Sequence, residues 1–186
     1  MIAAAFGAAG CAATGPTAGP GEASIDPQSD VKTLQVAYAD FDEAADLYAA
    51  AATATTDETE KSLLTDLADS RRELAEISSA LISERAGIPD VTASTGFSDA
   101  AGFAGNDAVN VWQVMAGGLK AEDYVIARLQ AALADPAISV DTKTFFQSSL
   151  PALRRERTRL AEAVAELPAI PEITPAGAAT GDPDPS

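Results

Sequence analysis

Glutamate is the residue type here that could best take part in catalysis or metal binding, because the chain holds no histidine and a single cysteine. Without histidine, the commonest metal ligand and the usual general base near neutral pH are both missing. Ser-His-Asp and Cys-His catalysis are excluded, and one cysteine forms neither an internal disulfide nor a zinc–thiolate cluster. Carboxylates acting alone remain, and the chemistry that they suit is the binding of iron or manganese.

The acidic residues that such a site would use are spread over four stretches of the chain. Helical bundles with two metal ions take a Glu from each of two helices and a Glu-x-x-His pair from each of the others. Glu73 and Glu76 have this spacing, with Glu in place of His. In the last stretch Glu156 is followed by Arg159, whose positive charge opposes a cation. The candidate metal ligands are Asp42 or Glu43, Glu73, Glu76, Glu122 and Glu156.

Glu122 is the most suggestive of these carboxylates. It follows Leu119 by three residues and precedes Ile126 by four, which predicts a side chain that points toward a core. A buried carboxylate is costly unless it meets a cation or an arginine, or stays protonated. We favour an ion pair with an arginine of the last stretch; a degenerate metal site and exposure to solvent are the alternatives. The candidate partners are Arg154, Arg155, Arg157 and Arg159.

Four stretches have apolar residues at steps of three and four and are predicted to be helices. They cover about 30–53, 58–86, 107–134 and 140–167. The expected core positions include Leu34, Phe41, Tyr48, Leu67, Leu74, Ile77, Trp112, Met115, Leu129, Val140, Phe146 and Leu153.

The ends of these helices carry recognisable signals. Asp57, with Glu60 three residues later, has the spacing of a capping box. Gly87 is expected to end the second helix in a left-handed conformation. Asn106 or Asp107 is the expected cap of the third helix, and Pro151 is expected to bend the fourth.

The lengths of the connections predict the topology. About five residues join the first helix to the second and the third to the fourth, which makes two antiparallel hairpins. Residues 87–106 join the hairpins, and about 20 extended residues reach roughly 65 Å, farther than the ~40 Å of a long helix here. We therefore expect an all-α, ferritin-like four-helix bundle with a long crossover between helices 2 and 3. An up-down-up-down bundle with a surface loop is the alternative.

Several stretches of these helices carry a resemblance to a known family. They are Leu34–Ala45 (LQVAYADFDEAA), Leu64–Leu74 (LTDLADSRREL), Ala121-Glu122-Asp123 before Leu129–Leu133, and Gln147 with Leu150. Over roughly residues 30 to 165 the chain resembles a bacterial ferritin-like family of unknown function, whose members are four-helix bundles. The resemblance implies the fold and leaves the function open.

The sole cysteine, Cys11, follows an apolar run of small residues and precedes a Gly- and Pro-containing segment. The layout resembles the end of a bacterial lipoprotein signal peptide, with Ala8-Ala9-Gly10-Cys11 at the place of the lipobox. This resemblance implies a lipid on Cys11 that anchors the protein in the cell envelope, and Ala12 after it implies the outer membrane, facing the periplasm. A tail with an incidental thiol is the alternative, since no Lys or Arg precedes the apolar run.

The chain is accordingly divided into four parts. Residues 1–11 form a lipoprotein-type signal segment, 12–29 a flexible tether, 30–167 the bundle and 168–186 a Pro/Ala/acidic tail that is expected to be disordered. With 28 acidic and 12 basic residues the net charge is -16, which repels nucleic acid, so no nucleic acid partner is expected.

Three functions follow from these features. The first is a non-catalytic, lipid-anchored envelope protein with a structural or interaction role. The second is a ferritin-like carboxylate protein of the di-iron type with a degenerate site for Fe or Mn. The third is a bundle that binds a small molecule or cation in a pocket beside Gly117-Gly118, a pair of glycines at which a kink or a close helix approach is expected.

Overall fold

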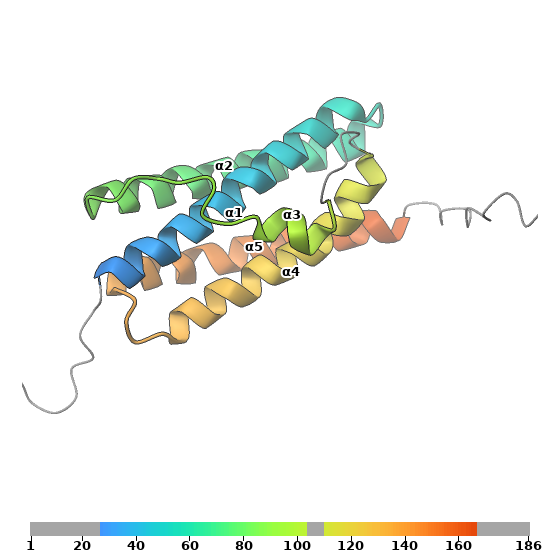
Figure 1. The fold of residues 1–186 in the computed structure, drawn as a ribbon. Coiled ribbons are helices and arrows are strands. Elements are labelled where there is room, and N and C mark those ends of the chain that lie inside the picture. The colour runs from blue at the N-terminus through green and yellow to red at the C-terminus, as the bar shows by residue number, and fades with distance from the viewer. Residues whose placement is uncertain (1–26, 104–109, 167–186) are drawn as a thin grey trace, which may run out of the picture.

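The computed structural model describes residues 27–103 and 110–166, and in this part of the chain it is all-helical. The described helices are α1 (Pro27–Ala54), α2 (Glu58–Glu84), α3 (Gly96–Ala101), α4 (Val111–Ala134) and α5 (Val140–Glu166). The four long ones form an elongated bundle, and α3 lies along its side (Figure 1). None of the described helices is long and apolar enough to cross a membrane. Cys11 and the predicted tail lie outside the described residues.

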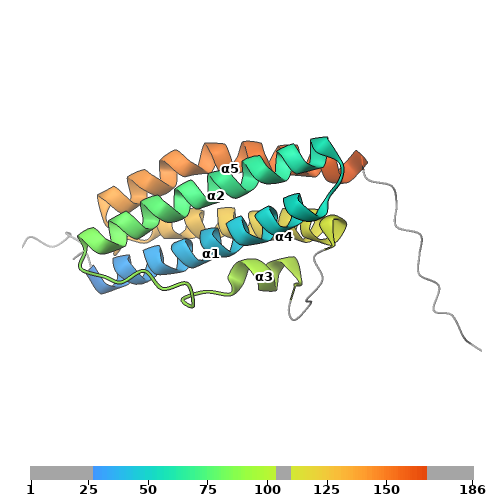
Figure 2. The ribbon, with the colours of Figure 1, turned by 90° about the horizontal axis from the view of Figure 1, so that it is seen from above.

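The long helices pack as a square in which neighbours run in opposite directions. α1 packs against α2 and α4, and α5 packs against the same two helices. α2 ends where α1 and α5 begin, and from there residues 85–95 return along the bundle to α3 (Figures 1 and 2). α4 then starts at the opposite end, so α2 and α4 run in the same direction. An up-down-up-down bundle would not give this order.

Asp57 starts α2 as the sequence predicts. Its Oδ1 accepts the backbone N–H groups of Thr59 at 2.8 Å and Glu60 at 3.0 Å, which satisfies two donors that the first helical turn leaves free. Only this half of the capping box forms. The Glu60 carboxylate instead accepts the hydroxyl of Thr55 at 2.6 Å.

The end of α2 differs from the prediction. Ala86, not Gly87, takes the left-handed conformation, with φ of 56°. The N–H of Gly87 then donates to the carbonyl of Ile82 at 3.0 Å, and that of Ala86 to Ser83 at 3.0 Å, which is a Schellman motif. Gly87 is needed for space, because a Cβ there would lie 2.8 Å from the Ile82 side chain and 2.9 Å from that of Val31.

Two helix starts are also corrected. α1 begins at Pro27, three residues before the predicted start, so the predicted tether 12–29 extends too far. Pro is favoured in a first helical turn because that N–H has no helical partner. α4 begins at Val111, not at 107, and Asn110 caps it by accepting the Trp112 N–H at 3.0 Å. The predicted caps Asn106 and Asp107 lie outside the described residues.

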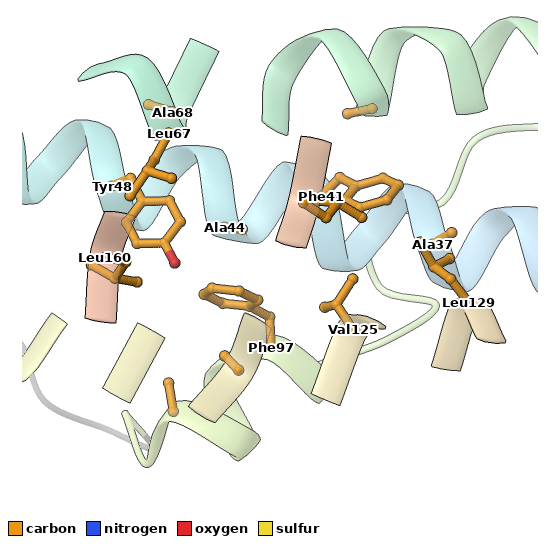
Figure 3. Packing of buried hydrophobic residues seen from close by; sticks show 14 of the residues in the cluster. Ala37, Phe41, Ala44, Tyr48, Leu67, Ala68, Phe97, Val125, Leu129 and Leu160 are labelled. Atoms are coloured by element: carbon orange, nitrogen blue, oxygen red, sulfur yellow. The ribbon is translucent and has the colours of Figure 1, made fainter. Parts of the chain in front are cut away.

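Most predicted core positions are buried. Leu34, Phe41, Leu67, Met115, Phe146 and Leu153 are among them. Small residues let the helices approach closely, and Figure 3 shows Ala37 and Ala44 of α1 facing the bundle interior. Ile77 and Val140 were predicted wrongly: they are 40% and 73% exposed, because the buried stripe of α2 is rotated toward Ala75 and Ser78, and Val140 stands at a helix start.

Gly117 and Gly118 mark a close approach, one of the two predicted alternatives. A Cβ on Gly117 would lie 2.5 Å from the carbonyl oxygen of Ala101, and one on Gly118 would lie 2.8 Å from the hydroxyl of Tyr48. The position that a Cβ would take at each glycine is thus occupied by Tyr48, or by Phe103 and the Ala101 backbone, and neither glycine lines any of the cavities given for the described residues. α5 continues through Pro151, which lies on an exposed face.

Candidate functional site

The middle of the bundle holds a buried arginine. α2 turns Arg71 inward because it shares a face with apolar residues one turn before and after it, Leu67 and Ala75. The side chain is 1% exposed, so its guanidinium cannot reach water. A buried guanidinium needs acceptors for its N–H groups within the protein.

Two carboxylates from two other helices meet these N–H groups. Glu122 of α4 accepts from Nη2 through Oε2 at 2.7 Å and from Nε through Oε1 at 3.1 Å, a bidentate pair. Glu156 of α5 accepts from Nη1 through Oε2 at 2.5 Å. Glu122 is fully buried, whereas the Glu156 side chain keeps 18% exposure. One guanidinium thus joins α2 to both α4 and α5.

Tyr48 adds the fourth long helix to this cluster. Its hydroxyl donates to Glu122 Oε1 at 2.9 Å, and the missing Cβ of Gly118 leaves room for it. Its ring packs edge-on against Phe97 of α3, with ring centroids 5.8 Å apart (Figure 3). We call Tyr48, Arg71, Glu122 and Glu156 the central cluster. Each comes from a different long helix.

The charges of the central cluster are set by one another. Burial lowers the pKa of Arg71, but the negative charges of Glu122 and Glu156 outweigh it and hold the pKa above its ordinary value. Burial and the neighbouring Glu122 charge raise the pKa of the Tyr48 hydroxyl well above its usual range. Arg71 is therefore charged and Tyr48 neutral at physiological pH. Among the described residues, no buried side-chain nitrogen or oxygen lacks a hydrogen-bond partner.

The fold brings two of the predicted metal ligands together and places the others apart from them. Glu122 and Glu156 come together, with the Arg71 guanidinium between them. Glu43 instead accepts the backbone N–H of Ser98 at 3.1 Å and holds α3 against α1. Glu73 and Glu76 lie on the exposed face of α2. Asp42 is half-buried on α1. In the described ranges, no three acidic or cysteine side chains are placed to share a metal ion.

Glu122 does pair with an arginine, but not with one of the arginines expected from α5. Arg157 instead forms a two-point pair with Asp123, both bonds at 2.9 Å, and Arg159 bonds Asp66 at 2.8 Å. Both of these pairs lie near the surface. The missed partner, Arg71, had a signal in the sequence, since it lies four residues after Leu67 and four before Ala75 on the buried face of α2.

Two further ion pairs fix the rest of the bundle. At the start of α1, Asp30 accepts Arg85 Nε at 2.6 Å and the N–H and hydroxyl of Ser139 at 3.0 and 2.9 Å. Halfway along α1, Asp40 accepts Ser94 at 2.6 Å and Arg128 Nη1 at 3.2 Å. The first joins the two hairpins at one end. The second holds the connection between α2 and α3 against the bundle.

The central cluster can therefore hold four helices in one register around a fixed positive charge. Every nitrogen of the guanidinium is bonded to a carboxylate, and Nη1 also donates to the Ser70 hydroxyl at 3.3 Å, so four of its five N–H groups are used by the bundle itself. Comparisons of the chain with models of protein families, with curated proteins and with solved structures find no match. The family resemblance read from the sequence stays a prediction.

Proposed function

We propose that this chain is a non-catalytic, lipid-anchored protein of the bacterial cell envelope, a helical bundle of the ferritin-like type with a structural or interaction role. The observation that carries the proposal is the Arg71 guanidinium between Glu122 and Glu156. Ferritin-like enzymes hold their metal ions in the bundle core, between carboxylates of facing helices. Here an arginine from α2 takes that place.

Charge explains why this arrangement favours a structural role. A divalent cation between Glu122 and Glu156 would meet the positive charge of Arg71, which already bonds both carboxylates. Breaking a buried ion pair by removing one partner is strongly destabilising, about 3–5 kcal/mol. Displacing Arg71 from Glu122 and Glu156 would therefore destabilise the bundle. The up, down, down, up order of the long helices supports the ferritin-like type.

The anchor rests on the sequence around Cys11. Expression of the full chain in a bacterium that processes lipoproteins, followed by mass spectrometry of the membrane fraction, tests it. We expect a mature chain that begins at Cys11 and carries a diacylglycerol, and we expect Cys11→Ser to stay unprocessed and unlipidated. A wild-type chain that begins at unmodified Met1 would rule out the anchor.

The second candidate, a degenerate carboxylate metal site, is favoured by the convergence of Glu122 and Glu156 with Tyr48 from three long helices. Purified protein incubated with Fe(II) or Mn(II), desalted and analysed for metal tests it, with Glu122→Ala and Glu73→Ala for comparison. Metal that stays with the wild type and is lost only in Glu122→Ala would favour this candidate over the first. Retention that neither change alters would eliminate it.

A further inference from the structure

A second region of the bundle contains a cavity, whereas the side chains of the central cluster bond one another directly. A cavity of about 210 Å³ lies between α1 and α4, with α5 behind it. Its apolar walls are Val36 and Ala37 of α1, Val125, Leu129 and Ala132 of α4, and Phe146 of α5. Figure 3 shows Ala37 and Leu129 close together across the α1–α4 interface. The central cluster contributes no side chain to it.

Charged side chains stand at the two ends of this cavity. Asp40 and Arg128 lie at the inner end, and Lys32 and Ser29 lie toward the start of α1. Asp40 is satisfied, because Ser94 donates to Oδ1 at 2.6 Å and Arg128 to Oδ2 at 3.2 Å. Arg128 and Asp40 neutralise each other as a pair. The Asp40 carboxylate is thus already hydrogen-bonded and paired with a cation of the protein.

The two cationic side chains that line the cavity, Arg128 and Lys32, have fewer of their donors bonded to described residues. The hydrogen bonds of Arg128 to described residues all come from Nη1, to Asp40, Ser94 and Tyr124. Lys32 is exposed, and among the described residues no side chain pairs with its ammonium group. The lining therefore carries one positive charge in excess, within a chain whose net charge is -16.

We propose that the cavity binds a small monocarboxylate with an apolar body, held by Lys32 at its carboxylate and by the α1–α4 walls at its body. An apolar cavity with a few convergent polar groups is the usual form of a small-ligand site. An apolar cavity of about 150 Å³ holds a benzene ring, so this one suits a short alkyl chain or a single ring. The Lys32 ammonium, which no described side chain pairs, selects an anion, because the one carboxylate of the lining already accepts from Ser94 and Arg128.

Isothermal titration calorimetry of the full chain with hexanoate tests the proposal. Hexylammonium and 1-hexanol serve as probes with the same alkyl chain and a different head. Hexanoate is expected to bind saturably at millimolar concentrations, and the other two more weakly. Tighter binding of hexylammonium or equal binding of hexanol would overturn the assignment of charge, and no saturable binding of hexanoate would overturn the site.

Two matched pairs of variants locate the binding. Ala132→Leu fills the cavity and is expected to weaken hexanoate binding at least tenfold, whereas Ala127→Leu, on the exposed face of α4, leaves it unchanged. Lys32→Gln removes the ammonium and is expected to weaken binding about fivefold, with Lys120→Gln as its control. Each variant is first checked for its helical circular dichroism and melting transition. Equal affinities within both pairs would place the ligand elsewhere and overturn the proposal.

Discussion

Arg71 and Arg128 each stand beside a buried carboxylate, yet the two regions are built differently. Arg71 is 1% exposed, and all three of its nitrogens bond carboxylates, two to Glu122 and one to Glu156. The Arg128 side chain is 34% exposed, and its hydrogen bonds to described residues all come from Nη1, beside a cavity. In the first region the protein itself bonds every nitrogen of the guanidinium. The second has donors and space left over, which is why we assign stability to one and binding to the other.

The pKa values of the acidic partners follow the same contrast. Burial raises the pKa of Asp40 above its ordinary value, although the hydrogen bond from Ser94 and the Arg128 charge oppose the rise. Burial also acts on Asp30, but there the hydrogen bonds from Ser139, Arg85 and Thr142 outweigh it and lower the pKa. The direction of each shift therefore depends on whether the donors around the carboxylate outweigh its burial, as they do at Asp30 and do not at Asp40.

The largest expected effect comes from removing the two arginines in turn. Arg71→Met leaves Glu122 buried without its ion pair and is expected to lower the free energy of unfolding by about 3–5 kcal/mol. Arg128→Met is expected to cost about 1 kcal/mol, because water reaches its place. Urea unfolding at pH 7 measures both, with the exposed Arg159→Met as reference. Equal losses for Arg71→Met and Arg128→Met would remove the distinction between the two regions.

A smaller effect separates the two tyrosines that touch these arginine regions. Tyr48→Phe deletes a buried hydrogen bond to the Glu122 carboxylate and is expected to cost about 1.5–3 kcal/mol. Tyr124→Phe deletes an acceptor for the half-exposed Arg128 and is expected to cost less than about 1 kcal/mol. The same urea titrations measure both, and a costlier Tyr124→Phe would contradict the assignment.

Ionisation of Tyr48 is expected to reduce the stability of the folded protein at alkaline pH. Its pKa is raised in the folded protein, so its contribution is complete below the ordinary tyrosine value of 10.0 and is lost as the pH rises toward the raised value. We expect the wild type to lose stability more steeply above this pH than Tyr48→Phe does. Thermal melts across the alkaline range measure it, and parallel curves would show that Tyr48 is not buried against Glu122.

The smallest effect concerns Asp40 and its pH dependence. Because its folded-state pKa is raised, the folded protein binds the Asp40 proton more tightly than the unfolded chain, and stability falls as the pH rises from the ordinary 3.8 through the raised value. Asp40→Asn is expected to remove this fall. For Asp30, whose pKa is lowered, stability instead falls as the pH drops below 3.8, and Asp30→Asn removes that loss. Melts from acid to neutral pH measure both slopes, and slopes of the same sign would contradict the assignments.

The helices were predictable because their apolar periodicity is strong. Leu34, Phe41 and Tyr48 were placed correctly, and so was the inward direction of Glu122. The face of α2 was misjudged, since after Leu67 its buried stripe continues through Ala68, Arg71, Ala75 and Ser78 to Ile82, and periodicity counts the middle four as weak or polar. The sequence therefore predicted a buried carboxylate with an arginine partner but drew that partner from the wrong helix.

Other features depend on spatial proximity that spacing along the chain does not encode. The cavity is lined by Ala37 of α1 and Ala132 of α4, which are far apart in sequence. Tyr48 was predicted as a plain core aromatic, and its role depends on the missing Cβ of Gly118. The short helix α3 was not predicted, because its six residues are too few to show a period.

A double-mutant cycle between Arg71 and Glu122 tests the central cluster most directly. The free energies of unfolding of the wild type, Arg71→Met, Glu122→Gln and the double variant give the coupling between the two side chains. We predict a coupling of about 2 kcal/mol or more, because the double variant no longer buries an unpaired charge at this position. Additive losses, with a coupling below about 0.5 kcal/mol, would mean that the guanidinium and the carboxylate do not meet in the core, and would contradict the account.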